Sequence, residues 1–433
     1  MLIFQHIPAI VRVIMVFILV LICIRKRLSL GNAFILGTIF LSVLFGIKPL
    51  AMLESMVASV LDLKTLSIAF IVSLILILSN NMELAGQMER LLEKFQGLVS
   101  NPKLNLIIFP ALIGLLPMPG GAVFSAPMVK KLGKTSKLSS DQLSFINYWF
   151  RHIWEYWWPV YPGVLLTTIL ADINILSIML FMCPLTIITV CLGYMTLKSS
   201  VKFQEEGKSS KRSSLLPFLK ELLPIIIVII PGLGMGIIFS LAFPTLIISK
   251  EIGLILALCM AIGWVWYENN ISKERIWQTL SNPWLLKMGY MIISIMIFKG
   301  ILEDSNAAAF ISHELVLLQV PLVLITVLLP FLVGMSTGIV IAFVGSTLPI
   351  LIPLINSFGE ANFIPAYVML VLTCGYAGVL LSPIHLCLLL SNEYFGATTG
   401  SVYRHLLLPC IFLVCISIIY FWVLRWLISP HFS

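Results

Sequence analysis

Long apolar segments, separated by short polar ones, run along almost the whole chain. Most of these segments approach the roughly 20 residues that an α-helix needs to cross the hydrocarbon layer of a membrane. We predict spans at residues 8–24, 28–47, 65–80, 142–170, 173–197, 222–243, 251–267, 284–302, 365–391 and 405–428. The pattern therefore predicts an all-α, polytopic membrane protein with ten crossings.

Two further apolar stretches cannot form continuous helices. In residues 109–131, two prolines and a Gly-Gly pair fall between Pro117 and Gly121, and both residue types oppose helix formation. Residues 320–354 contain GMSTG at 334–338 and GST at 345–347, between Pro330 and Pro349. Lipid tolerates non-helical backbone only where protein or a watery cavity surrounds it. We therefore predict two re-entrant hairpins, with a proline kink in a span as the simpler alternative for the first.

Two of the predicted spans contain breaks, and two amphipathic segments cannot span. Residues 142–170 contain Pro159 and Pro162, and residues 365–391 contain Gly375, Gly378 and the Ser382-Pro383 pair. Proline removes a helical hydrogen bond, so both segments are predicted to be broken helices. Residues 82–98, and a short piece after residue 302, alternate charge and apolar side chains and fit helices in the membrane interface.

The features of the first half recur in the second half in the same order. Pro110 and Gly114 match Pro330 and Gly334 at a shift of 220 residues, and a proline follows in each broken span. With ten crossings, the first hairpin opens inward and the second outward, which is the inverted repeat of secondary transporters. We predict a first repeat at 1–200, a cytoplasmic linker at 201–214 and a second, inverted repeat at 215–433.

Composition and charge agree with a membrane protein. The 433-residue chain is 60% hydrophobic and only 11% charged, whereas soluble domains carry about 25% charged residues. Its net charge is +8, but most Lys and Arg residues fall on one face of the predicted topology, which is the positive-inside pattern. We therefore expect a multi-pass protein of a prokaryotic inner membrane, with the lipid bilayer and no nucleic acid as partner.

These hairpins and breaks give the chain a resemblance to a known group. It resembles the ion transporter superfamily of citrate, dicarboxylate, arsenite and some sodium/proton carriers. The PMPGGAVFSAP run at 117–127 is more closely similar to an uncharacterised prokaryotic integral membrane family (DUF401-like) within that group. The resemblance implies re-entrant hairpins, unwound helices and a homodimer that moves as an elevator. The Ser-Asn-Thr hairpin tips of the dicarboxylate carriers are absent, so their sodium and dicarboxylate specificity is not implied.

The hairpin tips and helix breaks supply the candidate substrate-binding residues. Small residues expose backbone amides there, and helix N-termini that face the midplane attract anions. Alternatively, small residues only allow helices to pack closely in lipid. The candidates are Pro119, Gly120, Gly121, Ser125, Ser336, Thr337, Gly338, Ser346, Thr347, Ser382 and Pro383.

Four ionisable residues are candidates for ion coupling. Arg151, His152 and Glu155 fall near the middle of a predicted span, where charge is costly and marks function by default. If the helix is continuous, Arg151 and Glu155 lie one turn apart and neutralise each other, which is the structural alternative. His385 follows the second break and suits either a proton relay or a packing role.

The remaining motifs exclude several classes of protein. The sequence contains no Walker loop, G-x-S-x-G or H-E-x-x-H motif, so we expect neither an enzyme nor an ATP-driven pump. The eight cysteines lie in or beside apolar segments without metal-ligand spacing, so we expect no metal site. We predict a secondary active transporter of a small, organic acid-like anion, driven by Na+ or H+ as the coupling ion. A cation/proton antiporter is the alternative within transport, and a channel or non-transporting membrane scaffold is the alternative of another class.

Overall fold

The computed structural model describes residues 6–95, 98–99, 101–118, 120–135, 138–198 and 214–429, and every regular element in these ranges is a helix. The first half contains α1 (Ala9–Arg25), α2 (Leu30–Phe45), α3 (Pro49–Leu61), α4 (Leu63–Leu84), α5 (Gln87–Phe95), α6 (Pro102–Ile113), α7 (Ala122–Thr135), α8 (Ser140–Arg151), α9 (Pro162–Leu170) and α10 (Ile175–Lys198). The second half contains α11 (Leu215–Ala242), α12 (Ser249–Glu268), α13 (Lys273–Leu280), α14 (Pro283–Asp304), α15 (Ala307–Leu317), α16 (Leu322–Thr337), α17 (Val340–Ser357), η1 (Ala361–Phe363), α18 (Ile364–Leu380), α19 (Leu386–Phe395) and α20 (Thr399–Ile428).

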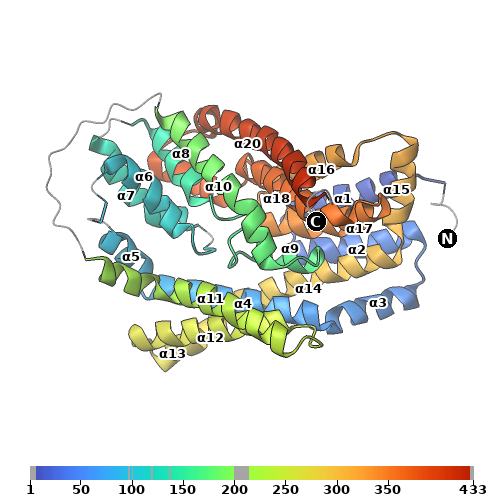
Figure 1. Ribbon diagram of the computed structural model, residues 1–433, viewed down its shortest axis with the longest axis horizontal. Coiled ribbons are helices and arrows are strands. Elements are labelled where there is room, and N and C mark those ends of the chain that lie inside the picture. Colours follow the sequence, from blue (N-terminus) through green and yellow to red (C-terminus); the bar gives the residue numbers. More distant parts are fainter. Residues whose placement is uncertain are drawn as a thin grey trace.

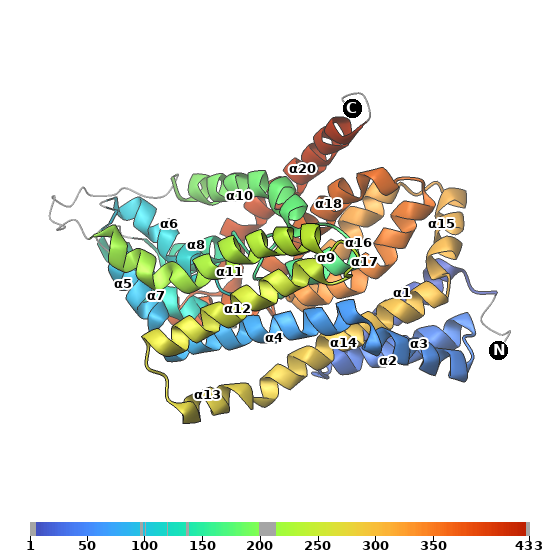
Figure 2. The same cartoon turned by 60° about the horizontal axis from the view of Figure 1, so that its bottom comes forward.

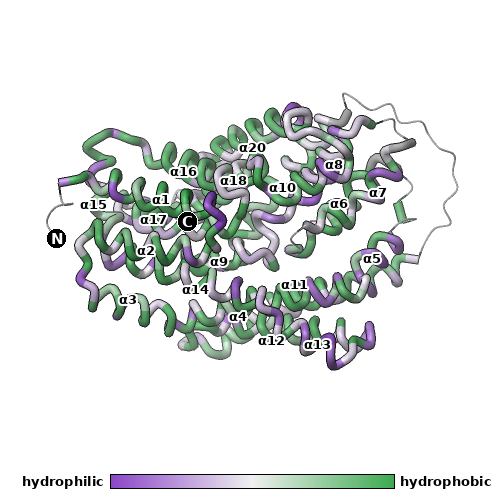
Figure 3. The backbone as a smooth tube through the Cα atoms, turned by 180° about the vertical axis from the view of Figure 1, so that it is seen from behind, coloured by the Kyte–Doolittle hydropathy of each residue, from purple (hydrophilic) through white to green (hydrophobic). Residues whose placement is uncertain are grey.

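Eight helical segments of the described chain are long and apolar enough to cross a membrane. Figure 3 shows how the apolar character extends along these helices. The predicted spans 8–24 and 28–47 form the shorter helices α1 and α2, of 17 and 16 residues. Conversely, α17 qualifies by length, although it lies in a predicted hairpin. The polytopic helical class is therefore clear, whereas the number of crossings stays a prediction.

The helices form two groups that pack side by side. We call α1, α2, α4, α11, α12 and α14 the frame, in which α14 packs on α2 and α4, and α12 packs on α4 and α11. We call α6–α10 and α16–α20 the core bundle, in which α18 packs between α16 and α20. In Figure 1, α4, α11 and α12 lie along the lower edge, and α8, α10, α16, α18 and α20 lie above them. The segment containing α18 is 83% buried and that of α10 only 28%, so α18 lies at the centre of the core bundle.

Polar contacts between distant segments mark the two ends of the bundle. Arg90 pairs with Glu221 at 3.1 Å and donates to Asn269 Oδ1 at 2.6 Å. Lys64, at the start of α4, pairs with Asp172, just after the end of α9, at 2.9 Å. Charged groups avoid the hydrocarbon interior, so these two sets define two polar faces. Figure 2 shows α5, which carries Arg90, at one end of the molecule and α3 and α15 at the other.

Two further polar contacts join distant segments of the chain. The Glu314 carboxylate accepts hydrogen bonds from the amides of Ala9 and Ile10, at 2.5 and 2.8 Å. These amides belong to the first turn of α1, where a carboxylate satisfies free N–H groups and complements the helix dipole. Arg425 pairs with Glu360 at 2.7 Å, joining the end of α20 to the loop before α18. These contacts join α15 to the start of α1, and the end of α20 to the segment before α18.

Each helix pair α6–α7 and α16–α17 turns sharply at a glycine. Gly120 has φ +75° and Gly338 has φ +65°, in the left-handed region that favours glycine. The two arms of each pair pack against each other. These turns fall at the predicted hairpin tips.

The two broken helices lie close to the predicted positions. Helix α8 ends at Arg151 and α9 begins at Pro162, with turns between them, and α18 ends at Leu380 and α19 begins at Leu386. Pro162 is the first residue of α9, where the missing N–H costs nothing, so it begins a helix instead of interrupting one. The first break therefore starts earlier than the prolines alone predict.

The first arm of each hairpin crosses the helix before the break at a glycine. A Cβ atom on Gly114 of the α6–α7 connection would lie 1.9 Å from the carbonyl oxygen of Arg151. A Cβ atom on Gly334 of α16 would lie 2.2 Å from the carbonyl oxygen of Gly375. Only glycine permits backbones to approach this closely.

Candidate functional site

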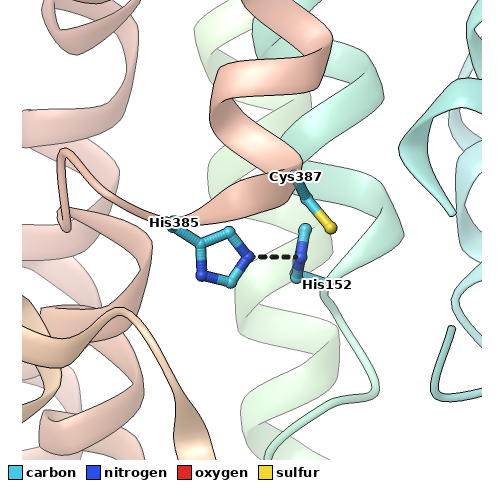
Figure 4. Close-up of side chains that lie close together, drawn as sticks. All are labelled: His152, His385 and Cys387. Atoms are coloured by element: carbon cyan, nitrogen blue, oxygen red, sulfur yellow. Dashed lines mark hydrogen bonds between the residues drawn. The ribbon is translucent and has the colours of Figure 1, made fainter. Parts of the chain in front are cut away.

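The two hairpin tips and the two helix breaks meet at one buried place. Arg151, the last residue of α8, donates through Nη2 to the carbonyl oxygen of Met118 at the first tip, at 2.7 Å. In the second break, the Nδ1 atom of His385 lies 2.8 Å from the carbonyl oxygen of Gly338 at the second tip. The Nε2 atoms of His152 and His385 lie 3.1 Å apart (Figure 4). Residues from both halves thus share one site.

Arg151 is a buried cation without a carboxylate partner in the described part of the chain. Its side chain is 3% exposed, and none of the ion pairs among the described residues includes it. Nη1 contacts His152 Nε2 and Cys387 Sγ, both at 3.5 Å, and Nε has no hydrogen-bond partner. A buried guanidinium with no directly paired carboxylate is unfavourable in a low-dielectric interior, so it has a capacity for a bound anion.

The ion pair between Arg151 and Glu155, which was the structural alternative to a coupling role, is not formed in the described structure. That alternative assumed a continuous helix, but α8 ends at Arg151 and residues 152–157 form turns. Glu155 Oε2 lies instead 3.5 Å from His152 Nε2 and has no hydrogen-bond partner. The Glu155 side chain is 16% exposed. The two charges therefore occupy separate positions around the histidine pair.

Hydrogen bonds to the backbone determine the tautomers of the two histidines. His152 Nδ1 lies 2.6 Å from the carbonyl oxygen of Tyr148, and His385 Nδ1 bonds the Gly338 carbonyl. A carbonyl oxygen only accepts, so each Nδ1 carries a proton and donates it. In the neutral rings, each Nε2 then carries a lone pair, and these two atoms lie 3.1 Å apart.

Cys387 completes the cluster from the first turn of α19. Its side chain is buried, and Figure 4 shows the sulfur pointing toward His152. The Sγ atom and one ring nitrogen of each histidine all lie within 4.8 Å of one another. This set of donors can hold a transition metal. In the sequence, this cluster corresponds to two short patterns, H-x-x-E at 152–155 and H-x-C at 385–387. Each pattern alone is too common to indicate a metal site.

Tyrosine hydroxyls satisfy the irregular backbone around the site. Tyr376 donates to the carbonyl oxygen of His152, and Tyr161 donates to that of Gly114 at 2.7 Å. Tyr148 donates to the carbonyl oxygen of Leu380 at 3.1 Å, at the end of α18. Free carbonyl groups are costly in a membrane interior, so these bonds stabilise both breaks.

The first hairpin contributes glycines to the site and a serine to its surroundings. A Cβ atom on Gly121 would lie 2.4 Å from Arg151 Nη2, whereas one on Gly120 would contact Leu390 at 3.1 Å. Ser125 donates to Asn147 Oδ1 at 2.6 Å, in a buried network beside the site. Pro119 lies outside the described residues.

Three hydroxyl groups of the second hairpin are hydrogen-bonded within their own helices. Thr337, Ser346 and Thr347 donate to carbonyl oxygens of their own helices, at 2.8, 2.7 and 2.8 Å. This back-bonding favours the packing interpretation for these three residues. Ser336 is half-buried on the last turn of α16, next to the tip at Gly338.

Two of the predicted residues, Ser382 and Pro383, lie in the second break and differ in burial. The Ser382 hydroxyl is fully buried without a hydrogen-bond partner, and it would lie 2.9 Å from a Cβ atom on Gly338. Pro383 follows it and is exposed. Ser382 is therefore the serine that retains a free donor at the site.

Long apolar helices, polar faces at both ends and a buried polar centre define a polytopic helical membrane protein. The chain belongs to the family described as protein of unknown function (DUF401), whose profile matches residues 9–424. A search of curated proteins returns no match.

Proposed function

We propose that the protein is a secondary active transporter that moves a small carboxylate-bearing anion across a prokaryotic inner membrane by alternating access. The observation that carries this proposal is Arg151, a buried guanidinium without a carboxylate partner in the described chain, where both tips and both breaks meet. A carboxylate is the planar, bidentate partner that guanidinium prefers. The substrate anion would supply a carboxylate that pairs with this guanidinium directly.

Equivalent contacts in the two halves support an internal repeat at 1–200 and 215–433. Gly114 touches the carbonyl of Arg151, and Gly334 touches that of Gly375. The two glycines are 220 residues apart, as are Pro110 and Pro330. The two carbonyl residues are 224 apart, as are Pro159 and Pro383 of the two broken spans. The same close approach therefore occurs at matching positions of both halves.

A second pair of contacts follows the same two shifts. Trp154 donates to the carbonyl oxygen of Ala111 at 2.9 Å, and a Cβ atom on Gly378 would lie 2.1 Å from the carbonyl oxygen of Phe331. Ala111 and Phe331 are 220 residues apart, and Trp154 and Gly378 are 224 apart. Packing that repeats while the side chains differ is what a diverged structural repeat produces.

The polar faces support opposite orientations of the two repeats. Arg90, before the first hairpin, contacts residues 221 and 269, all of which the proposed topology assigns to the cytoplasmic side. Glu314, before the second hairpin, contacts the start of α1, and both lie on the outer side of that topology. The linker at 201–214 lies outside the described residues except for Ser214. Two hairpins entering from opposite faces are the arrangement that alternating access uses.

A cavity between the frame and the core bundle supports relative movement of the two groups. It measures about 540 Å³ and is lined by α4, α11 and α12 of the frame and by residues 165–176 of the core bundle. The cavity lies at the face that carries Lys64 and Asp172.

A channel would need a continuous polar pathway, whereas apolar side chains of α17 and α18 surround the site.

The proposal is tested by a stabilisation screen of the purified protein. Succinate, malate, citrate and lactate would be tested separately, with and without Na+ and at several pH values, because a ligand that binds the native state raises its melting temperature. We expect at least one anion to raise it, and the same anion to enter proteoliposomes under an ion gradient. Stabilisation without uptake would contradict the transport function, and the absence of both would contradict the anion class.

The orientation is tested by labelling of single cysteines. Ser281→Cys, between α13 and α14, and Asp304→Cys, at the end of α14, are placed at exposed positions of a variant without native cysteines. We expect a membrane-impermeant maleimide to label residue 304 in intact cells and residue 281 only after permeabilisation, because the positive-inside pattern assigns them to opposite sides. Labelling of both positions from outside would be incompatible with inverted repeats.

A further inference from the structure

The cluster at the centre of the site has the geometry of a metal centre. Two imidazole nitrogens bound to one tetrahedral Zn²⁺ at about 2.0–2.1 Å lie roughly 3.3 Å apart. The Nε2 atoms of His152 and His385 are 3.1 Å apart, and Cys387 Sγ lies within 4.8 Å of a ring nitrogen of each histidine. We propose that these three atoms bind a transition-metal ion of the Zn²⁺ class, in a site with an open fourth position.

The first argument is the repulsion between the two rings. Both Nδ1 atoms donate to backbone carbonyls, so neither neutral ring carries a proton on Nε2. Two nitrogen lone pairs at 3.1 Å repel each other unless a positive species lies between them. A metal ion removes this repulsion and uses both lone pairs as ligands.

The second argument is the orientation of the ligands. Histidines that bind metals almost always donate their other ring N–H to a carbonyl or carboxylate, which holds the ring in place. The Tyr148 and Gly338 carbonyls serve both histidines in this way, at 2.6 and 2.8 Å. The two rings come from different breaks, their planes meet at 74°, and the fold brings their Nε2 atoms to 3.1 Å from each other.

The charges around the cluster determine what else binds there. Arg151 Nη1 lies 3.5 Å from both His152 Nε2 and Cys387 Sγ, and this cation opposes a second one. The Cys387 thiolate and the Glu155 carboxylate, 3.5 Å from His152 Nε2, supply the opposing negative charge. A metal-bound thiolate can still accept the hydrogen bond from Arg151.

The donor set selects the class of metal. Two imidazoles and one thiolate suit Zn²⁺, Co²⁺ or Cd²⁺ and do not suit Mg²⁺ or Ca²⁺, which prefer oxygen ligands. Three protein ligands with an open fourth position are typical of sites that bind an exchangeable ligand. The fourth ligand can be water, Glu155 or, if the proposed function holds, a substrate carboxylate beside Arg151.

The test uses Co²⁺ alone, added to the purified full-length protein in detergent after treatment with a chelator. We expect one Co²⁺ per chain, with intense visible bands of four-coordinate cobalt and a thiolate charge-transfer band in the near ultraviolet. Zn²⁺ should displace the cobalt and abolish both signals. The measurement needs no substrate and no transport, so its outcome is independent of the proposed function.

Two cysteine variants identify the ligand. Cys387→Ser should remove the charge-transfer band and weaken Co²⁺ binding at least tenfold. Cys374→Ser is the matched control, because Cys374 is equally buried in α18 but its sulfur contacts Ser417 instead of the histidines. This control should keep both the band and the affinity.

Two outcomes would overturn the proposal. Folded wild-type protein that gives no charge-transfer band has no thiolate metal site, and a proton shared by the two imidazoles then accounts for their contact. A band that persists in Cys387→Ser would assign the metal to another cysteine. The wild-type spectrum tests the proposal by itself, so the test still holds if a variant misfolds.

Discussion

Alanine in place of Gly114 or Gly334 is expected to destabilise the protein by about 1–3 kcal/mol or more, as overpacking of a tight contact does. The added methyl group would lie 1.9 Å from the Arg151 carbonyl oxygen in the first variant and 2.2 Å from that of Gly375 in the second. Both obstacles are backbone atoms, so no side-chain rotation relieves the overlap and the hairpin arm must move away. The measurement is the melting temperature of each purified variant, together with its elution profile.

The control for these variants is Gly263→Ala. Gly263 lies within α12, and a Cβ atom there meets nothing within 4 Å. Alanine should raise the stability there by about 0.5–1 kcal/mol, because it is the better helix former. If Gly114→Ala and Gly334→Ala melt like the control, the close approach is wrong in both halves, and the argument for the repeat loses its strongest support.

Replacing Arg151 by Gln is expected to abolish anion binding while the protein stays folded. Loss of one partner of a buried charge pair costs 2–5 kcal/mol, which corresponds to roughly 30-fold or more in affinity. Gln is polar and keeps an amide donor at this position, but it has no charge for a carboxylate. The measurement is the dissociation constant of whichever anion stabilises the wild-type protein.

Arg425→Gln is the matched control for Arg151→Gln. Arg425 pairs with Glu360 at the polar face and lies far along the chain from the breaks, so its loss should leave anion affinity unchanged. Arg151→Lys tests charge separately from geometry, because Lys keeps the positive charge but lacks the planar guanidinium that binds a carboxylate through two hydrogen bonds. We expect this variant to bind the anion more tightly than Arg151→Gln and more weakly than the wild type. Wild-type affinity in Arg151→Gln would remove Arg151 from the substrate site.

The structure also predicts how a double variant behaves. A direct ion pair between Arg151 and Glu155 would let Glu155→Gln rescue Arg151→Gln, since neither charge would then be left alone. The two residues form no ion pair in the described structure, so we expect no rescue of anion binding by the double change. A double variant with wild-type binding would restore the ion-pair interpretation.

Local chemistry in the sequence was sufficient to predict the elements of the fold. Apolar length predicted membrane helices, because the hydrocarbon layer requires it at every crossing. The glycines at 120 and 338 predicted the turns between helix pairs, since both adopt positive φ. The recurrence of Pro110 and Gly114 at Pro330 and Gly334 depended only on order and spacing, and it led to the contacts that match in the two halves.

The partners of the polar side chains were decided only by the tertiary structure. A one-turn spacing left an ion pair between Arg151 and Glu155 open as an alternative, but that spacing brings side chains together only on a continuous helix, and α8 ends at Arg151. The hydroxyls of Thr337, Ser346 and Thr347 looked like ligands, yet each donates within its own helix.

The central cluster is the clearest case of side-chain contacts that the sequence did not predict. His152 and His385 are 233 residues apart in sequence, and nothing local to either indicates that their Nε2 atoms meet at 3.1 Å. Helix length, turns and breaks follow from the residues in each segment, because backbone hydrogen bonding and local sterics determine them. The contacts of a buried polar side chain depend instead on which distant segment packs beside it, and that packing is a property of the whole fold.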